Sequence, residues 1–261
     1  MNPEINPSEL TKPATSELPA VPYLRGVGLA KSFGHVRALH DVDIDIFERE
    51  GLAIVGDNGA GKSTLIKILS GVFPPDRGDL FIGQEKVRFG NARRAHEMGV
   101  ATVFQTLALV NCRNVVCNIF LGREPTFWGI FVDQKKMMTD ARVALMDLGV
   151  HIPTLLAEAG ELSGGQRQCI AIARATSQHS RVIIMDEPTA ALGVKESGKV
   201  LDLIERLKSA GRAVVIISHN LHHVFSVADR IMVLCRGRVA GLRRKEETTP
   251  DEIVSLIVGA G

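Results

Sequence analysis

The sequence predicts an α/β fold, because short apolar runs alternate with helical segments along the chain. Three of these runs are typical of strands buried on both faces and span Leu52–Val55, Val182–Met185 and Ala213–Ile217. A segment with helical spacing follows the second run at Lys195–Leu207. Buried parallel strands that alternate with helices are typical of an α/β core.

The middle of the chain has a different pattern, which predicts a helical subdomain inserted into this core. From Asn111 onward we find no convincing strand, whereas apolar residues recur at helical spacing in Met138–Leu148 and Gly164–Ala175. We place the insertion at residues 107–178.

The two ends of the chain flank this core. Residues 1–24 carry five prolines among Ser, Thr and Glu, which predicts a disordered tail, because this composition buries too little apolar surface to fold. Residues 25–261 are then one domain. Near the C-terminus we expect a hairpin over Val233–Leu242, and a helix that begins at Pro250 after the cap residue Thr249.

Composition and charge exclude several classes of protein. The 261 residues are 45% hydrophobic and 23% charged, which is ordinary for a globular domain and excludes disorder throughout. Lys and Arg number 31 against 29 Asp and Glu, so the formal net charge is +2, and only 5% of residues are aromatic. Nucleic acid is therefore not expected as a partner, and any anion site must be local.

Cysteines and apolar stretches bear on the compartment. Four cysteines stand without a CxxC pair or a histidine at metal-ligand spacing, so we expect free thiols in a reducing compartment. The N-terminal residues lack the pattern of an export signal, and no stretch approaches the roughly 18 apolar residues that span a bilayer. We expect a cytosolic chain whose membrane contact comes through a partner. The cysteines are Cys112, Cys117, Cys169 and Cys235.

A glycine-rich loop follows the first apolar strand and precedes a helical segment. It matches the pattern G-x-x-x-x-G-K-[ST] in the strand, loop and helix context that a phosphate-binding loop requires. Glycines let backbone N–H groups converge on an anion, Lys62 would reach the β and γ phosphates, and the Ser63 hydroxyl would bind Mg²⁺. The loop comprises Gly56, Asp57, Asn58, Gly59, Ala60, Gly61, Lys62, Ser63 and Thr64.

Two adjacent acids end the second apolar strand. Asp186 would hold Mg²⁺, and Glu187 would orient or deprotonate an attacking water, which is what nucleotide hydrolysis requires. Acids that only decorate a helix N-terminus are the alternative. Beside the phosphate loop, the functional interpretation is favoured.

A third motif, Leu162–Gln168 before a helical run, resembles the signature of ATP-binding cassette ATPases, and the resemblance extends over residues 25–261. It implies a P-loop NTPase core with an antiparallel β subdomain and an inserted α-helical subdomain. It also implies two domains facing head to tail, with each ATP between the phosphate loop of one and the signature of the other. The signature residues that act in trans are Ser163, Gly164, Gly165 and Gln166.

The same resemblance assigns further residues. Phe33 stands where the family stacks an aromatic ring on adenine, with a buried strand aromatic as the alternative. Gln105 matches the glutamine that contacts Mg²⁺ and water, and His219 matches the histidine that contacts the γ phosphate and positions Glu187. Gly193 departs from the family, which usually has an aspartate there. The implied Mg²⁺ ligands are Ser63, Gln105 and Asp186.

Three segments resemble the branch of this family that energises the import of simple sugars such as ribose, xylose and fructose. They are Ala190–Ser197, Gly122–Glu124 and Glu97–Val100. The branch implies an ATPase subunit of a bacterial importer, peripheral on the cytoplasmic face of the inner membrane and paired with a second copy. A permease would contact it near Gln105–Arg123, and an extracytoplasmic sugar-binding protein would act indirectly.

Alternatives remain open from the sequence. They are an ATPase of the same family for another substrate, an exporter or a soluble translation factor of that family, and a regulatory module that binds ATP without turnover. The sequence does not identify the sugar, because the permease and the binding protein make that choice.

Overall fold

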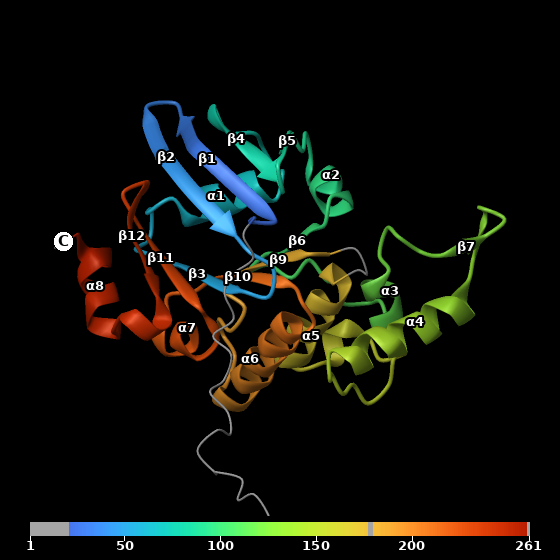
Figure 1. Ribbon diagram of the computed structural model, residues 1–261. Coiled ribbons are helices and arrows are strands. Elements are labelled where there is room, and N and C mark those ends of the chain that lie inside the picture. Colours follow the sequence, from blue (N-terminus) through green and yellow to red (C-terminus); the bar gives the residue numbers. More distant parts are fainter. Residues whose placement is uncertain (1–20, 177–179, 260–261) are drawn as a thin grey trace, which may run out of the picture.

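The computed structural model describes residues 21–176 and 180–259, so most of the expected N-terminal tail lies outside the described residues. The first strand already begins at Leu24, inside the segment predicted to be the tail. Two large sheets, a two-stranded hairpin and the helices between and beside them make up the fold (Figure 1). Among the described helices, none is both long and apolar enough to cross a membrane.

The central sheet has six strands in the order β12-β11-β3-β10-β9-β6. Neighbouring strands from β11 to β6 pair in parallel, whereas β12 pairs antiparallel with β11. The three predicted buried strands are confirmed as β3, β9 and β10, and the predicted C-terminal hairpin as β11 and β12. Their bounds are Gly51–Val55 (β3), Val100–Val103 (β6), Val182–Asp186 (β9), Ala213–Ile217 (β10), Arg230–Cys235 (β11) and Arg238–Arg244 (β12).

A separate antiparallel sheet has four strands in the order β2-β1-β4-β5. Their bounds are Leu24–Phe33 (β1), Val36–Ile46 (β2), Arg77–Ile82 (β4) and Glu85–Val87 (β5). The helix α1, Lys62–Leu69, lies between this sheet and the central sheet (Figure 1). Its buried Leu65 and Leu69 share one hydrophobic core with both sheets, so packing on two sides fixes the helix that follows the phosphate loop.

Helices cover the opposite face of the central sheet. Side chains of α5, Gly164–Ala175, and α6, Val194–Ser209, pack with Ile183 and Ile216 in a second core. The helix α7, Leu221–Val227, and α8, Pro250–Val258, pack against β11 in a third core. As predicted, Thr249 caps α8, its hydroxyl accepting a hydrogen bond from the Glu252 N–H at 3.3 Å.

The remaining helical elements are short. The helix α2 spans Ala92–Glu97, and 3-10 turns span Ala159–Glu161 and Lys245–Glu247.

The predicted helical insertion contains α3, Val115–Ile119, and α4, Gln134–Asp147, before α5. The expectation that it holds no strand is wrong. Two-residue strands β7, Thr126–Phe127, and β8, Phe131–Val132, form an antiparallel hairpin between α3 and α4. Such strands are too short for their alternation to be visible in a sequence.

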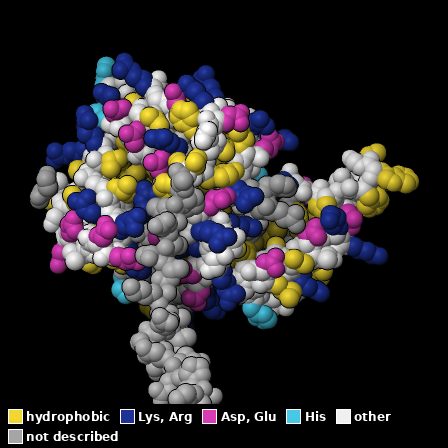
Figure 2. All heavy atoms as spheres, in the orientation of Figure 1, with side chains coloured by type: hydrophobic (Ala, Val, Ile, Leu, Met, Phe, Trp, Pro, Cys, Tyr) yellow, Lys and Arg dark blue, Asp and Glu magenta, His cyan; other side chains and the backbone are white. Residues whose placement is uncertain are grey.

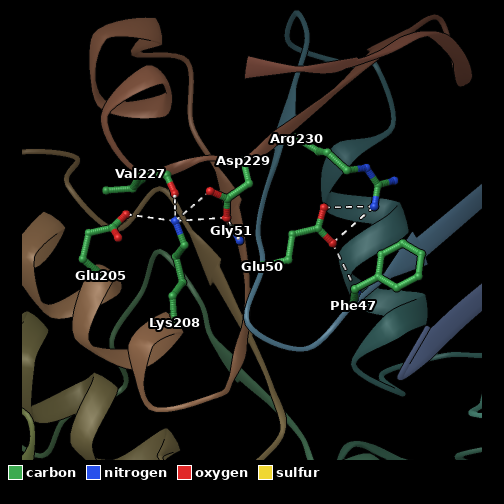
Figure 3. A network of polar contacts seen from close by, with 8 residues as sticks. All are labelled: Phe47, Glu50, Gly51, Glu205, Lys208, Val227, Asp229 and Arg230. Carbon is green, nitrogen blue, oxygen red and sulfur yellow. Dashed lines mark hydrogen bonds and ion pairs between the residues drawn. The ribbon is translucent and has the colours of Figure 1, made fainter. Parts of the chain in front are cut away.

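A buried ion pair anchors the strand that leads to the phosphate loop (Figure 3). Glu50 directly precedes β3, and its carboxylate accepts hydrogen bonds from Arg230 at 2.9 and 3.2 Å and from the Phe47 N–H at 3.2 Å. The Arg230 guanidinium also lies 5.3 Å from the centre of the Phe47 ring. Burial raises the pKa of Glu50, and the charge of Arg230 lowers it. The pair joins β11 to the start of β3.

A second polar contact holds the same end of β3 (Figure 3). The Asp229 carboxylate accepts the Gly51 N–H at 2.7 Å and pairs with Lys208 of α6 at 3.0 Å. The Lys208 ammonium also donates to the Val227 carbonyl at 2.8 Å and to Glu205 at 3.0 Å. One lysine therefore connects α6, the end of α7 and the first residue of β3.

Candidate functional site

The phosphate loop runs from the end of β3 into α1 with the geometry that its glycines allow. Gly56 has φ 149°, and a Cβ there would lie 2.1 Å from the Leu234 carbonyl oxygen. Gly61 has φ 103°, and a Cβ there would lie 2.6 Å from the Ala38 carbonyl oxygen. Side chains at these two positions would therefore push the loop away from its neighbours.

The Lys62 side chain folds back over this loop. Its ammonium donates hydrogen bonds to the carbonyl oxygens of Gly56 at 2.6 Å and Asp57 at 2.8 Å. Burial lowers the pKa of Lys62, whereas the nearby charges of Glu187, Asp57 and Asp186 raise it. An ammonium held beside a glycine-rich loop in this way is suited to bind phosphate oxygens.

A cavity of about 1010 Å³ opens over the loop and brings most of the predicted residues together. Gln105, Asp186, Glu187 and His219 line it from the ends of β6, β9 and β10. The carboxyl ends of parallel strands meet at one edge of a sheet, which explains why distant residues converge there. Members of the phosphate loop that line it are Gly56, Asp57, Asn58, Gly59, Gly61, Lys62, Ser63 and Thr64.

Glu187 and His219 are in direct contact in this cavity. His219 Nδ1 lies 2.8 Å from Glu187 Oε1, and the Glu187 side chain is only 15% exposed. The Glu187 backbone has φ 51°, an uncommon conformation for this residue type, and its N–H donates to the Ile217 carbonyl at 2.9 Å. Burial raises the pKa of the neighbouring Asp186, and the charge of Glu187 raises it further, while Lys62 lowers it.

The predicted Mg²⁺ ligands also share this cavity. Ser63, Gln105 and Asp186 all line it, and together they offer a hydroxyl, an amide oxygen and a carboxylate. Mg²⁺ prefers such oxygen ligands and is usually bound by one or two carboxylates together with substrate phosphates. Within residues 21–176 and 180–259 no group of three or more His, Cys, Asp or Glu side chains forms a metal cage. The donor set fits a cation that arrives with a nucleotide.

Phe33 lies at the end of β1 and is not among the residues that line this cavity. Its ring is 49% exposed and meets Phe73 edge to face, with 5.6 Å between the ring centres. The alternative of a buried strand aromatic is therefore wrong. Stacking on adenine stays a prediction, for which a half-exposed ring is available.

The signature residues lie at a different place on the chain. Ser163 caps α5 in a reciprocal capping box, in which its hydroxyl accepts the Gln166 N–H at 3.3 Å and Gln166 Oε1 accepts the Ser163 N–H at 3.0 Å. Ser163, Gly165 and Gln166 line a separate cavity of about 350 Å³. One chain therefore does not bring its own signature to its own phosphate loop.

The structure also places residues at these sites that sequence reasoning missed. Glu196 of α6 lies against the signature, and hydrogen bonds from the Ser163 hydroxyl, then from the Gly165 and Gly193 N–H groups, lower the pKa of its carboxyl. An acidic residue three positions after Gly193 was the available signal. At the nucleotide-sized cavity, Arg37 and Arg236 add two cations that no motif marks.

The fold and this site define a P-loop ATPase of the ATP-binding cassette type. A family model described as ABC transporter matches residues 39–190, so the chain belongs to the ABC transporter family. ATP is the nucleotide of this family, and ATP hydrolysis is its activity.

Several curated relatives are sugar import proteins. The chain is 48% identical to the xylose/arabinose import ATP-binding protein of Sulfolobus acidocaldarius, over 87% of this chain and 90% of the relative. It is 43% identical to the fructose import ATP-binding protein of Rhizobium meliloti, over 92% and 95%. It is 39% identical to the ribose import ATP-binding protein of Clostridium tetani, over 91% of this chain and 47% of the relative, so it spans about half of that protein.

Solved structures agree with this assignment. The fold matches an ATP-binding cassette of an ABC transporter with a TM-score of 0.79 and 27% identity, over 91% of this chain and 99% of that one. It also matches a dimeric cassette in a post-hydrolysis state bound to ADP and phosphate, with a TM-score of 0.72 and 25% identity, over 85% and 98%.

Proposed function

We propose that this chain is the ATPase subunit of an importer for a simple sugar, in which ATP hydrolysis drives a separate membrane permease. The observation that carries the proposal is the single cavity that joins the phosphate loop, Asp186, Glu187 and His219. The import proteins for xylose or arabinose, fructose and ribose support the sugar. Residues 25–261 act as one ATPase unit, with the helical subdomain inserted at about residues 107–178.

The residues of the cavity divide the chemistry among themselves. Backbone N–H groups of the loop and the Lys62 ammonium bind the phosphates of ATP, and Ser63, Gln105 and Asp186 hold Mg²⁺. When bound, Mg²⁺ neutralises part of the charge on the phosphates. Glu187 accepts a proton from water as the water oxygen attacks the γ phosphorus and the bond to ADP breaks.

His219 keeps this base in place. Its contact with Glu187 at 2.8 Å orients the carboxylate, and its exposed ring lines the same cavity as the phosphate loop. The donors that complete the site come from Ser163, Gly164, Gly165 and Gln166 of a second copy. The separate position of the signature supports this arrangement, as does the dimeric form of a related cassette.

Coupling to a permease is proposed for the segment from Gln105 to Arg123. Arg174, at the end of α5, donates to the carbonyl oxygens of Leu107 at 2.5 Å and Ala108 at 2.8 Å. Arg123 in turn donates to the Arg174 carbonyl oxygen. Movement of the signature helix would therefore be transmitted directly to the loop after Gln105. The subunit would be peripheral on the cytoplasmic face of the inner membrane, with an extracytoplasmic binding protein selecting the sugar.

The test is ATP turnover of the purified full chain, with and without its permease in proteoliposomes. We expect Mg²⁺-dependent phosphate release that rises when the permease is present. Absence of turnover under both conditions would support a regulatory ATP-binding module and overturn the proposal. If the permeases encoded by neighbouring reading frames leave ATP turnover unchanged, that result would contradict a role in import.

A further inference from the structure

An apolar finger projects from the helical subdomain. The hairpin of residues 126–132 stands away from the rest of the molecule in Figure 1, and its hydrophobic side chains form the isolated tip in Figure 2. Trp128 is 89% exposed and Ile130 is 77% exposed. Large apolar residues scattered singly on a surface are ordinary, but a contiguous group of them marks an interaction site. The exposed members are Phe127, Trp128, Ile130, Phe131 and Val132.

The finger has a defined shape. Thr126 pairs with Val132 and Phe127 with Phe131, and the two phenyl rings stack with 5.7 Å between their centres. The Asp133 N–H donates to the Pro125 carbonyl at 2.8 Å and closes the base. Isolated two-stranded hairpins are marginally stable in water, so contact with an apolar medium would stabilise this one.

The charged residues beside the finger indicate that the apolar medium is a lipid bilayer. Residues 126–132 contain no charged side chain. The Asp133 carboxylate that follows caps α4 by accepting the Lys136 N–H at 2.9 Å, and Lys135 and Lys136 then stand exposed in the first turn of the helix. Lys136 also pairs with Asp140, and Arg142 lies seven residues after Lys135, on the same face of the helix. An uncharged aromatic tip followed by exposed cations matches the apolar interior and the anionic headgroups of a bilayer.

The position of the finger points the same way. The finger begins seven residues after α3 ends. It therefore follows directly after the segment Gln105–Arg123, which faces the permease in the proposed function. This orientation toward the membrane rests on that proposed function. Apolar side chains occupy both faces of the ribbon and its tip, because Phe127 and Phe131 share one face while Val132 lies on the other. A groove on a protein would cover one face, whereas a bilayer interface surrounds a tip on all sides.

We propose that the hairpin of residues 126–132 inserts its tip into the interfacial layer of an anionic lipid bilayer, and so gives the subunit its own contact with the membrane. Trp128 is the single tryptophan of the chain, so its fluorescence reports directly on the tip. Vesicles of phosphatidylcholine with phosphatidylglycerol should shift the emission of the full chain to shorter wavelengths. Vesicles of phosphatidylcholine alone should bind more weakly, because they carry no net negative charge to attract the Lys and Arg side chains.

Two variants with matched exposure give the control. Ile130→Ser should lower the vesicle partition coefficient about tenfold, because one exposed apolar side chain no longer enters the bilayer. Val258→Ser, at an equally peripheral side chain that is 66% exposed on α8, should leave partition unchanged. Neither residue lines the nucleotide cavity, so ATP turnover should be unchanged in both variants.

The outcomes separate this proposal from the proposed function. Emission that does not shift with anionic vesicles, or that shifts equally in Ile130→Ser, would overturn lipid insertion. A shift that occurs only when the permease is present in the vesicles would assign the finger to a protein partner and overturn it too. Loss of turnover in the unmodified chain would instead overturn the ATPase proposal, whatever the vesicles show.

Discussion

Replacing Glu187 by glutamine removes one negative charge and one proton acceptor while leaving the size of the side chain nearly unchanged. Glu187 is 15% exposed and lies 2.8 Å from His219, so its carboxylate is held at the edge of the cavity. A positioned general base contributes about 10² to 10⁴ to a rate, which corresponds to a barrier change of roughly 2.7 to 5.4 kcal/mol. We expect the turnover of Glu187→Gln to fall by a factor in this range.

Binding of ATP should survive the same substitution. The Lys62 ammonium is held by the carbonyl oxygens of Gly56 and Asp57. The Glu187 side chain takes no part in these two hydrogen bonds. Removing a negative charge beside the phosphates also lowers their repulsion, so the ATP-bound dimer should become more stable.

Two quantities are measured. Phosphate release gives the turnover, and the molecular mass in solution with ATP present gives the fraction of dimer. The control is Glu246→Gln, which removes an exposed carboxylate from the 3-10 turn Lys245–Glu247 and should leave turnover unchanged. A turnover of Glu187→Gln equal to that of the unmodified chain would refute Glu187 as the base. Lost ATP binding would refute the separation of binding from catalysis.

Three further predictions concern neighbouring groups. His219→Ala should lower turnover about 10-fold to 100-fold with ATP affinity nearly unchanged, because Glu187 loses the partner that orients it. Arg230→Met should lower the free energy of unfolding in urea by about 3 kcal/mol, because it leaves the buried Glu50 carboxylate without its cation. Burial and Glu187 raise the pKa of Asp186, so Mg-ATP binding should weaken as the pH falls through that raised value. In Glu187→Gln this midpoint should move to lower pH, because the negative charge that raises the pKa of Asp186 is gone and only burial still raises it.

Each of these has an outcome that contradicts it. Unchanged turnover in His219→Ala would remove the orienting role. Urea unfolding of Arg230→Met that matches Arg244→Met, an exposed arginine, would mean that the buried pair contributes nothing. A pH midpoint that does not move would show that Asp186 does not sense the charge of Glu187.

Local patterns predicted the parts of this molecule that depend on local chemistry. The phosphate loop requires glycine at positions 56 and 61, because both have positive φ and a carbonyl oxygen lies where a Cβ would be. The two glycines therefore appear directly in the sequence motif. Buried parallel strands such as β10, Ala213–Ile217, are apolar throughout and are therefore also visible. The α5 helix, Gly164–Ala175, has the predicted bounds, and the capping box of Ser163 and Gln166 fixes its start.

Contacts that arise from packing were not predictable in this way. Glu196 meets the signature because α6 packs on α5, and a pattern along one helix does not report its neighbour. Glu50 and Arg230 are 180 residues apart, so only the pairing of β11 with β3 joins them. The hairpin of residues 126–132 was missed because two-residue strands give no periodic signal.

In the proposed function, each ATP site is shared between two copies of the chain. It is tested by mixing two inactive variants, Lys62→Ala, which lacks the phosphate-loop cation, and Gly164→Asp, which puts a carboxylate at the signature. Aspartate is favoured in the first turn of a helix, so α5 should keep its start. In the mixed dimer, the intact phosphate loop of the Gly164→Asp chain faces the intact signature of the Lys62→Ala chain, so one of the two ATP sites is complete. We predict ATP turnover of the mixture well above the sum of the two variants measured separately, and turnover equal to that sum would contradict the shared site.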